Sequence, residues 1–393
     1  MAIRTALTAP HPASALLDRG LVLPDPAQVY VDRSVDLARL QPGATLCPGA
    51  RVAGEVTFIG AGAVIGSEGA ATALDCAIDA DVEFCSGYAD GAVLFRGAKL
   101  GGSAHVRPAT ILEEGASTAH AVGLKQSLLM SHVTFGSLIN ACDLLVAGGT
   151  SKHDHSEVGS GFIHFNFTPW GERGDKATPS LVGNVHEGVF LNRKRVFLGG
   201  LSGLVGPGEV GFGSMTIAGQ VIRRPVGADR LSGAVPPSVD RDMPTSSSVV
   251  VGNRAKLRAN FHYVGQLCAL RAWYVQVRIA RRARFEGDGE VHAEVLAAGV
   301  RALDAMIRER LLRLDQYCPD NRWSMDAFLP GSEGAGMPRE DVAQALRDHR
   351  PDLPHLDWVR SLDGGLVEQG VGWLHGVGES AAQRIGACFP DVP

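Results

Sequence analysis

The sequence of 393 residues lacks the cysteine pairing, long apolar runs and charge excess that mark several large protein classes. Its seven cysteines are scattered and include no Cys-x-x-Cys pair, which excludes a disulfide framework and a zinc knuckle. No stretch approaches the roughly 18 apolar residues of a membrane-spanning helix, and the first residues show no signal-peptide core. With 37 basic and 42 acidic residues, nothing suggests nucleic acid as a partner. We therefore expect a cytoplasmic protein that binds a small molecule, and neither a nucleic acid nor a membrane.

The most informative feature present is a period of six residues. Thirteen successive positions in this register are apolar or small, although only 45% of the chain is hydrophobic. They are Leu40, Leu46, Val52, Phe58, Val64, Ala70, Cys76, Val82, Tyr88, Leu94, Leu100, Val106 and Leu112. This period matches neither an amphipathic helix nor an alternating strand. It is typical of a solenoid in which three hexapeptides complete one coil and each first residue points into the core.

Changes in composition divide the chain into three parts. Residues 1–38 read as an N-terminal leader with one helical turn near Ala13–Asp18, and residues 39–233 as the hexapeptide-repeat β-helix. A linker rich in proline and serine then leads to an α-helical C-terminal region over residues 250–393. Within it we expect helices over 255–285, 291–317 and 339–347, packed against the end of the solenoid or against a neighbouring subunit.

Four segments between residues 107 and 226 carry a resemblance to a known family. In chain order they are RPATILEEGASTAHAVGLKQS, SHVTFGS, EVGSGFIHFNF and TIAGQV. Their order and spacing resemble motifs of the C-terminal acetyltransferase domain of bifunctional glucosamine-1-phosphate acetyltransferase/UDP-N-acetylglucosamine pyrophosphorylase. The resemblance implies a mainly β fold, a left-handed parallel β-helix, with active sites between the subunits of a homotrimer. It also implies an acyl-CoA co-substrate, most simply acetyl-CoA, and no metal.

His132 is the candidate catalytic base. It opens the segment HVTF, which is similar to the family motif that bears this base. Acyl transfer from a thioester to an amine requires removal of the ammonium proton, and imidazole does this well because its pKa lies near the working pH. Without the resemblance, a structural histidine would be the more common interpretation of this residue.

Four polar residues are candidates for binding the acceptor. By the resemblance, Arg107, Lys125 and Lys176 hold a sugar phosphate, and Asn166 hydrogen-bonds the sugar. A guanidinium fork and an ammonium neutralise a phosphoryl group, while an amide both donates and accepts. Arg107 and Lys125 stand 18 residues apart, which is one coil of three hexapeptides. We therefore expect them to stack on one face.

Other positions concern the cofactor and the identity of the acceptor. Ala218 and Gly219 stand where the family packs coenzyme A, since small side chains permit close approach to the backbone. Phe135 replaces a family tyrosine and is expected to contact the substrate. The loss of polar groups suggests a modified acceptor, a phosphorylated or nucleotide-linked amino sugar. Residues 1–38 contain no glycine-rich nucleotide loop, so we expect no nucleotidyltransferase activity.

Two other functions remain open from the sequence. His153, His155 and His164 form a cluster that would suit a β-helix metalloenzyme of the γ-carbonic-anhydrase type, in which zinc lowers the pKa of bound water. The family spacing of such ligands is not matched. A catalytically silent scaffold that binds sugar nucleotides is the other alternative.

Overall fold

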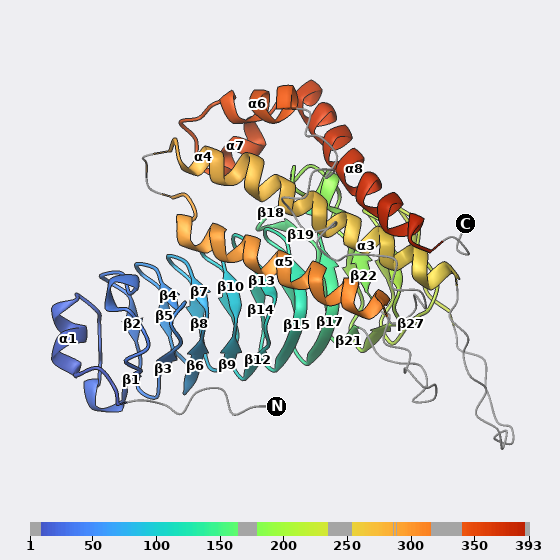
Figure 1. Ribbon diagram of the computed structural model, residues 1–393. Coiled ribbons are helices and arrows are strands. Elements are labelled where there is room, and N and C mark those ends of the chain that lie inside the picture. The colour runs from blue at the N-terminus through green and yellow to red at the C-terminus, as the bar shows by residue number, and fades with distance from the viewer. Residues whose placement is uncertain are drawn as a thin grey trace, which may run out of the picture.

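The chain winds into a parallel β-helix and then returns along it as a layer of α-helices (Figure 1). The computed structural model describes residues 9–163, 179–234, 254–285, 287, 289–315 and 340–389. The predicted fold class, a left-handed β-helix with a C-terminal helical extension, is confirmed. Across these described ranges, no helix combines the length and the apolar character needed to cross a bilayer.

The strands form three faces of a prism. Face 1 contains β1 (Tyr30–Val31), β3 (Arg51–Ala53), β6 (Ala71–Leu74), β9 (Gly87–Asp90), β12 (Ala104–Val106), β21 (Gly161–Ile163), β24 (Ser202–Leu204) and β27 (Val221–Ile222). Face 2 contains β4 (Phe58–Ile59), β7 (Ala77–Ile78), β10 (Ala92–Leu94), β13 (Thr110–Leu112), β22 (Ser180–Val182) and β25 (Gly208–Val210). Face 3 contains β2 (Thr45–Leu46), β5 (Val64–Ile65), β8 (Glu83–Phe84), β11 (Lys99–Leu100), β14 (Ser117–Thr118), β16 (Thr134–Phe135), β20 (Glu157–Val158), β23 (Phe197–Leu198), β26 (Met215–Thr216) and β28 (Leu231–Ser232).

Two long strands, β15 (Val122–Leu129) and β17 (Ile139–Val146), bend from face 1 onto face 2. They join these two faces into one 16-stranded sheet, while face 3 is a separate 10-stranded sheet. A small antiparallel hairpin, β18 (Gly149–Ser151) with β19 (Asp154–His155), leaves the coil just after β17. Each edge of the prism is named by the two faces that it joins, so that edge 1/2 lies between face 1 and face 2.

The chain turns each edge through a left-handed backbone conformation. In the coil built from β15, β16 and β17, the turning residues are Gln126, His132 and Leu138, with φ of 49°, 68° and 58°. They lie at edges 1/2, 2/3 and 3/1 respectively. Such φ values are uncommon outside glycine. Because the backbone conformation sets the direction of the Cα–Cβ bond, the turn at each edge determines where the side chain of its turning residue points.

The core consists of apolar side chains stacked in register, coil upon coil. On face 2 the rung Leu94, Leu112, Leu129 and Val146 is fully buried, as the hexapeptide period predicts. Cys76 is also buried as expected.

The predicted register is wrong at three positions. Val64 and Tyr88 are half-buried and Ala70 is exposed, because the neighbouring residues Ile65, Ala89 and Ala71 take the inward positions. The reason is that the early coils differ in length. Val52 pairs with Ala73, 21 residues on, whereas Ala73 pairs with Ala89, 16 residues on.

The helices cover face 2 of the same chain and not the end of the solenoid, which was one of the two expected positions, while packing against a neighbouring subunit stays a prediction (Figure 1). Helix α5 (Ala293–Asp315) lies over β7, β10 and β13. Above it run α3 (Arg254–Trp273), a π-helical turn (Tyr274–Ile279) and α4 (Ala280–Arg282). The other helices are α1 (Ala13–Asp18), α2 (Val185–Gly188), α6 (Glu340–Asp348), α7 (His355–Ser361) and α8 (Gly364–Ala387), with 3₁₀ turns at Pro26–Gln28 and Leu37–Arg39. The predicted turn at Ala13–Asp18 and the three predicted helices are present.

Helices α7 and α8 were not predicted from the sequence, although α8 has 24 residues. Its many glycines are unfavourable in a helix and hide its pattern. The structure gives two close contacts, one at a glycine of α3 and one at a glycine of α8. A Cβ atom on Gly265 of α3 would lie 2.4 Å from the carbonyl oxygen of Gly378, and one on Gly370 would lie 2.5 Å from the ring of Phe190. Glycine therefore lets α3 and α8 approach each other closely.

Replacing Leu100 with alanine removes a fully buried side chain and is expected to lower the free energy of unfolding by about 2–5 kcal/mol. The matched control is Lys99→Ala in the same strand. Lys99 points outward and pairs with Glu83 at 2.7 Å, an exposed contact worth about 0–1 kcal/mol. Chemical denaturation measures both variants, and equal losses would contradict the inward and outward assignment.

Gly265→Ala is expected to destabilise the helical layer by about 1–3 kcal/mol, because the new methyl group has no room beside the backbone of Gly378. Gly376→Ala changes a glycine of α8, where a Cβ atom would meet nothing within 4 Å. That variant should gain about 0.5–1 kcal/mol from helix propensity. Thermal unfolding of the two proteins should thus shift in opposite directions, and a stabilised Gly265→Ala would rule out the close packing.

Candidate functional site

The structure places the candidate site residues on three different edges of the prism. Arg107 and Lys125 lie at edge 1/2, His132 lies at edge 2/3, and the turn of Ala218 and Gly219 lies at edge 3/1. Asn166 and Lys176 lie outside the described residues. One copy of the chain therefore does not bring the candidate base, the two cations and the candidate cofactor turn together.

Arg107 and Lys125 stack on adjacent coils, as their spacing predicts. Val106 pairs with Leu124 in the parallel ladder, so the next residues of the two strands are neighbours. Arg107 also donates from Nη2 to Cys142 Sγ at 3.6 Å. Burial raises the pKa of the Cys142 thiol, and the two cations act in the opposite direction. Within the described ranges neither cation has a carboxylate partner, so this edge is suited to an anion.

His132 lies in a closed environment. Its side chain is only 7% exposed, and the backbone N–H donates to the carbonyl of Glu114 at 2.9 Å. Arg360 of α7 places Nη2 3.4 Å from His132 Nε2, whereas Nδ1 has no partner in the described structure. The ring lies against Gly115 of the previous coil, where a Cβ atom would be 3.1 Å from Nδ1.

This environment keeps the imidazole neutral. Burial lowers the pKa of His132, and the positive charge of Arg360 lowers it further, while Glu114 opposes both effects. A neutral imidazole is the form that can accept a proton. Arg360, however, donates toward Nε2, so this guanidinium must move before the nitrogen can act as a base.

Beside His132, edge 2/3 carries a buried ion cluster that the sequence analysis did not identify. Tyr274 donates to Glu113 at 2.6 Å, Ser131 donates to both Glu113 and Glu114, and Arg278 pairs with Glu114. Burial raises the pKa of Glu113, whereas the two carboxylates hold Arg278 charged despite its burial. In the sequence, the cluster is indicated only by the adjacent glutamates of the segment ILEEGA. Its arginine, Arg278, lies 164 residues after Glu114 and so gives no local pattern. These contacts attach the π-helical turn to the β-helix.

Phe135 does not contact a surface ligand. Its side chain is fully buried in β16, in register with Thr118 below and Val158 above. The expectation that it binds substrate is therefore corrected, because the residue lies at an inward position of its strand and fills the solenoid core.

The turn between β26 and β27 is exposed at Ala218 and Gly219. The N–H of Gly219 donates to the carbonyl of Gly200 in the coil below at 2.9 Å. A Cβ atom on Gly219 would meet nothing within 4 Å. The turn thus presents backbone to open space, although this amide is already bonded.

Of the three histidines in the cluster, the structure describes two. His153 is exposed, His155 contacts the carbonyl of Lys152 through Nδ1 at 2.7 Å, and His164 lies outside the described residues. In the parts of the chain that the structure describes, no group of three His, Cys, Asp or Glu side chains could hold a metal ion. The metalloenzyme alternative thus has no support there.

Among curated proteins, the chain is similar to several that bear the name bifunctional protein GlmU. The chain is 29% identical to the bifunctional protein GlmU of Nocardia farcinica over 216 residues, 54% of this chain and 38% of that protein. It is 32% identical to the GlmU of a Thermus thermophilus strain over 196 residues, 50% of this chain and 37% of that protein. The match therefore spans less than two fifths of the length of either relative. No family model matches the chain. The β-helix and these similarities confirm the resemblance to a left-handed β-helix acetyltransferase domain.

Arg360→Gln is expected to raise the pKa of His132 toward the ordinary value of about 6.5, because it removes the positive charge nearest the ring. NMR titration of the imidazole signal measures the shift. Arg284→Gln is the control, since Arg284 pairs with Asp348 and makes no contact with His132. An unchanged pKa in Arg360→Gln would show that this arginine does not act on the imidazole.

Proposed function

We propose that the protein is an acyltransferase that moves an acyl group from acyl-CoA to the amine of an amino sugar. The acceptor carries a phosphate or a linked nucleotide. The observation that carries this proposal is the stacked pair Arg107 and Lys125, two neighbouring cations without a carboxylate partner in the described chain. The proposal is also supported by the resemblance of the chain to a β-helix acetyltransferase domain. That the protein has no nucleotidyltransferase activity stays a prediction.

In this proposal the two cations at edge 1/2 bind the acceptor's phosphoryl group. A guanidinium provides two parallel donors and the ammonium adds a point charge, so the pair neutralises and orients a phosphate. Asn166 and Lys176 remain proposed contacts to the same acceptor. Fixing the acceptor in this way makes the attack of its amine on the thioester effectively unimolecular.

His132 is proposed to take the proton from the ammonium group, which leaves a free amine. The amine attacks the thioester carbonyl, the tetrahedral oxyanion collapses, and coenzyme A leaves as a thiol after protonation. The lowered pKa of His132 supports this role because the ring is neutral near pH 7. The step requires Arg360 to leave Nε2, so α7 is part of the proposed mechanism.

A complete site is proposed to form between three copies of the chain. Base, cations and cofactor turn occupy different edges, so residues from more than one copy must meet. The helical layer covers face 2, which leaves faces 1 and 3 for other copies. Large apolar side chains are exposed on these faces and at edge 3/1, namely Leu138, Phe162, Leu201, Met215, Ile217, Val221 and Leu231. Such an apolar surface supports a homotrimer.

One observation favours the alternative of a non-catalytic binding scaffold. His132 is buried and Arg360 lies 3.4 Å from its Nε2, while at edge 1/2 Arg107 is exposed and Lys125 is half-buried. A protein with this arrangement would still bind a phosphorylated sugar. It would not turn over acyl-CoA.

Thiol release from acetyl-CoA and longer acyl-CoAs, with phosphorylated and nucleotide-linked amino sugars as acceptors, tests the two functions. Arg107→Ala and Lys125→Ala should raise the KM for the acceptor about 10-fold or more, because each removes a charge-assisted contact. His132→Ala should lower kcat by about 10²–10⁴-fold, the usual contribution of a general base.

The control is Lys99→Ala, which removes an exposed cation paired with Glu83 on face 3. A wild-type rate in His132→Ala would exclude the proposed base. Acceptor binding that depends on Arg107, without thiol release for any acyl-CoA, would establish the scaffold instead.

A further inference from the structure

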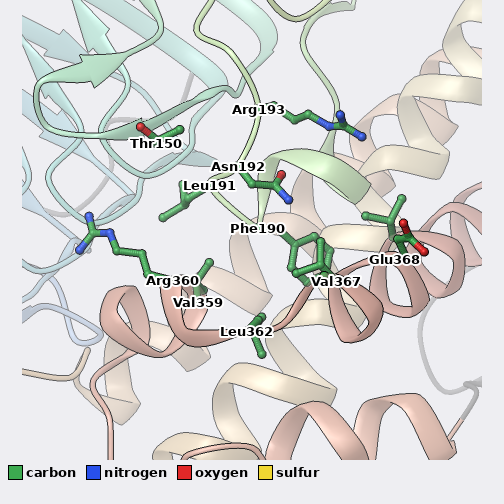
Figure 2. A pocket seen from close by; sticks show the side chains of 12 residues that line it. Thr150, Phe190, Leu191, Asn192, Arg193, Val359, Arg360, Leu362, Val367 and Glu368 are labelled. Atoms are coloured by element: carbon green, nitrogen blue, oxygen red, sulfur yellow. The ribbon is translucent and has the colours of Figure 1, made fainter.

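A cavity of about 740 Å³ lies between the helical layer and the loop that follows α2, on the side where α7 meets α8 (Figure 2). Its volume is within the usual range of small-molecule sites, roughly 300–1,000 Å³. Six apolar side chains line it, namely Phe190, Leu191, Val359, Leu362, Val367 and Val371. This lining suits an apolar chain or ring.

The charged groups of the cavity stand at separate places. Figure 2 shows Arg360 on one side and Glu368 on the opposite side, with Arg193 apart from both. Arg193 forms an ion pair with Glu187, and this carboxylate compensates the charge of the arginine. The cavity therefore has a cationic side chain, Arg360, at one rim and an anionic side chain, Glu368, at the opposite rim.

Arg360 is poorly satisfied by its own protein contacts. Its two contacts to described residues, Nη1 to Asp357 and Nη2 to His132 Nε2, are both 3.4 Å long. Good N–H···O hydrogen bonds measure about 2.7–3.2 Å, and a guanidinium has five N–H donors. The Asp357 carboxylate is 63% exposed, so water screens this ion pair. An incoming anion would compete for Arg360 at little cost.

We propose that this cavity binds an amphipathic ligand with an apolar body and a single anionic head. The body lies against the valines and Phe190, and a phosphate or carboxylate head accepts hydrogen bonds from the Arg360 guanidinium. Glu368 at the opposite side excludes ligands with an anionic group at both ends. The site is separate from the cations at edge 1/2, and its occupancy requires no acyl transfer, so the proposed function can fail while this proposal holds.

Calorimetric titration of the whole chain with octyl phosphate tests the proposal, without acyl-CoA or any sugar. The wild type should bind octyl phosphate more tightly than either half-probe, octanol or inorganic phosphate. Arg360→Gln should weaken octyl phosphate binding about 10-fold or more and leave octanol binding unchanged, because only the charged contact is lost. Val367→Trp fills the cavity and should weaken binding of both.

Arg284→Gln serves as the matched control, since Arg284 is an exposed arginine of the same layer that pairs with Asp348. It should bind octyl phosphate as the wild type does. Octanoate distinguishes the two possible heads, and binding of either amphiphile that depends on Arg360 supports the site. The proposal is overturned if the wild type binds neither amphiphile, or if Arg360→Gln binds both with wild-type affinity. Unchanged affinity in Val367→Trp, checked for a native melting profile, would equally exclude the cavity.

Discussion

Backbone hydrogen bonds between stacked coils are the interaction on which the rest of this protein depends. Most strands have only two to four residues, so none would be stable alone, and each is held by the equivalent strand of the adjoining coil. Stacking places every edge residue beside its counterpart one coil away. Arg107 lies next to Lys125 for this reason, and Gly115 lies next to the ring of His132. The arrangement of the candidate site is thus a property of the ladder.

Buried charges determine where the helical layer sits. Arg310 pairs with Asp143 at 2.6 Å, and Arg278 pairs with Glu114, all of them almost inaccessible to water. Removing two charges from water costs several kcal/mol per ion, which offsets much of their attraction. We interpret these pairs as fixing the position of the helices more than adding to stability. A shifted layer would leave carboxylates buried without a partner.

The features that could be predicted from the sequence are those set by residues close together in the chain. A six-residue period reveals the coil because each repeat carries it, and the same period predicted Arg107 beside Lys125. It could not reveal the cover over His132, because Arg360 lies 228 residues away. Helix α8 escaped detection because its glycines are unfavourable in a helix, and the close contacts that account for Gly370 and Gly378 are made with Phe190 and with Gly265, both distant in the chain. Phe135 was misassigned because similarity to a motif does not show whether a strand position points inward.

The helical cover has a consequence for synthesis on the ribosome. The β-helix leaves the exit tunnel before Arg278 and Arg310 do. Glu114 and Asp143 therefore stay hydrated until these two arginines emerge and pair with them. Domains generally begin folding from the N-terminal side during translation. A nascent solenoid therefore exposes the apolar side chains of face 2, with Asp143 and Glu114 at the edges of that face. Until the helices emerge, that face is an exposed apolar surface, the kind that makes folding chains prone to aggregation and that chaperones protect.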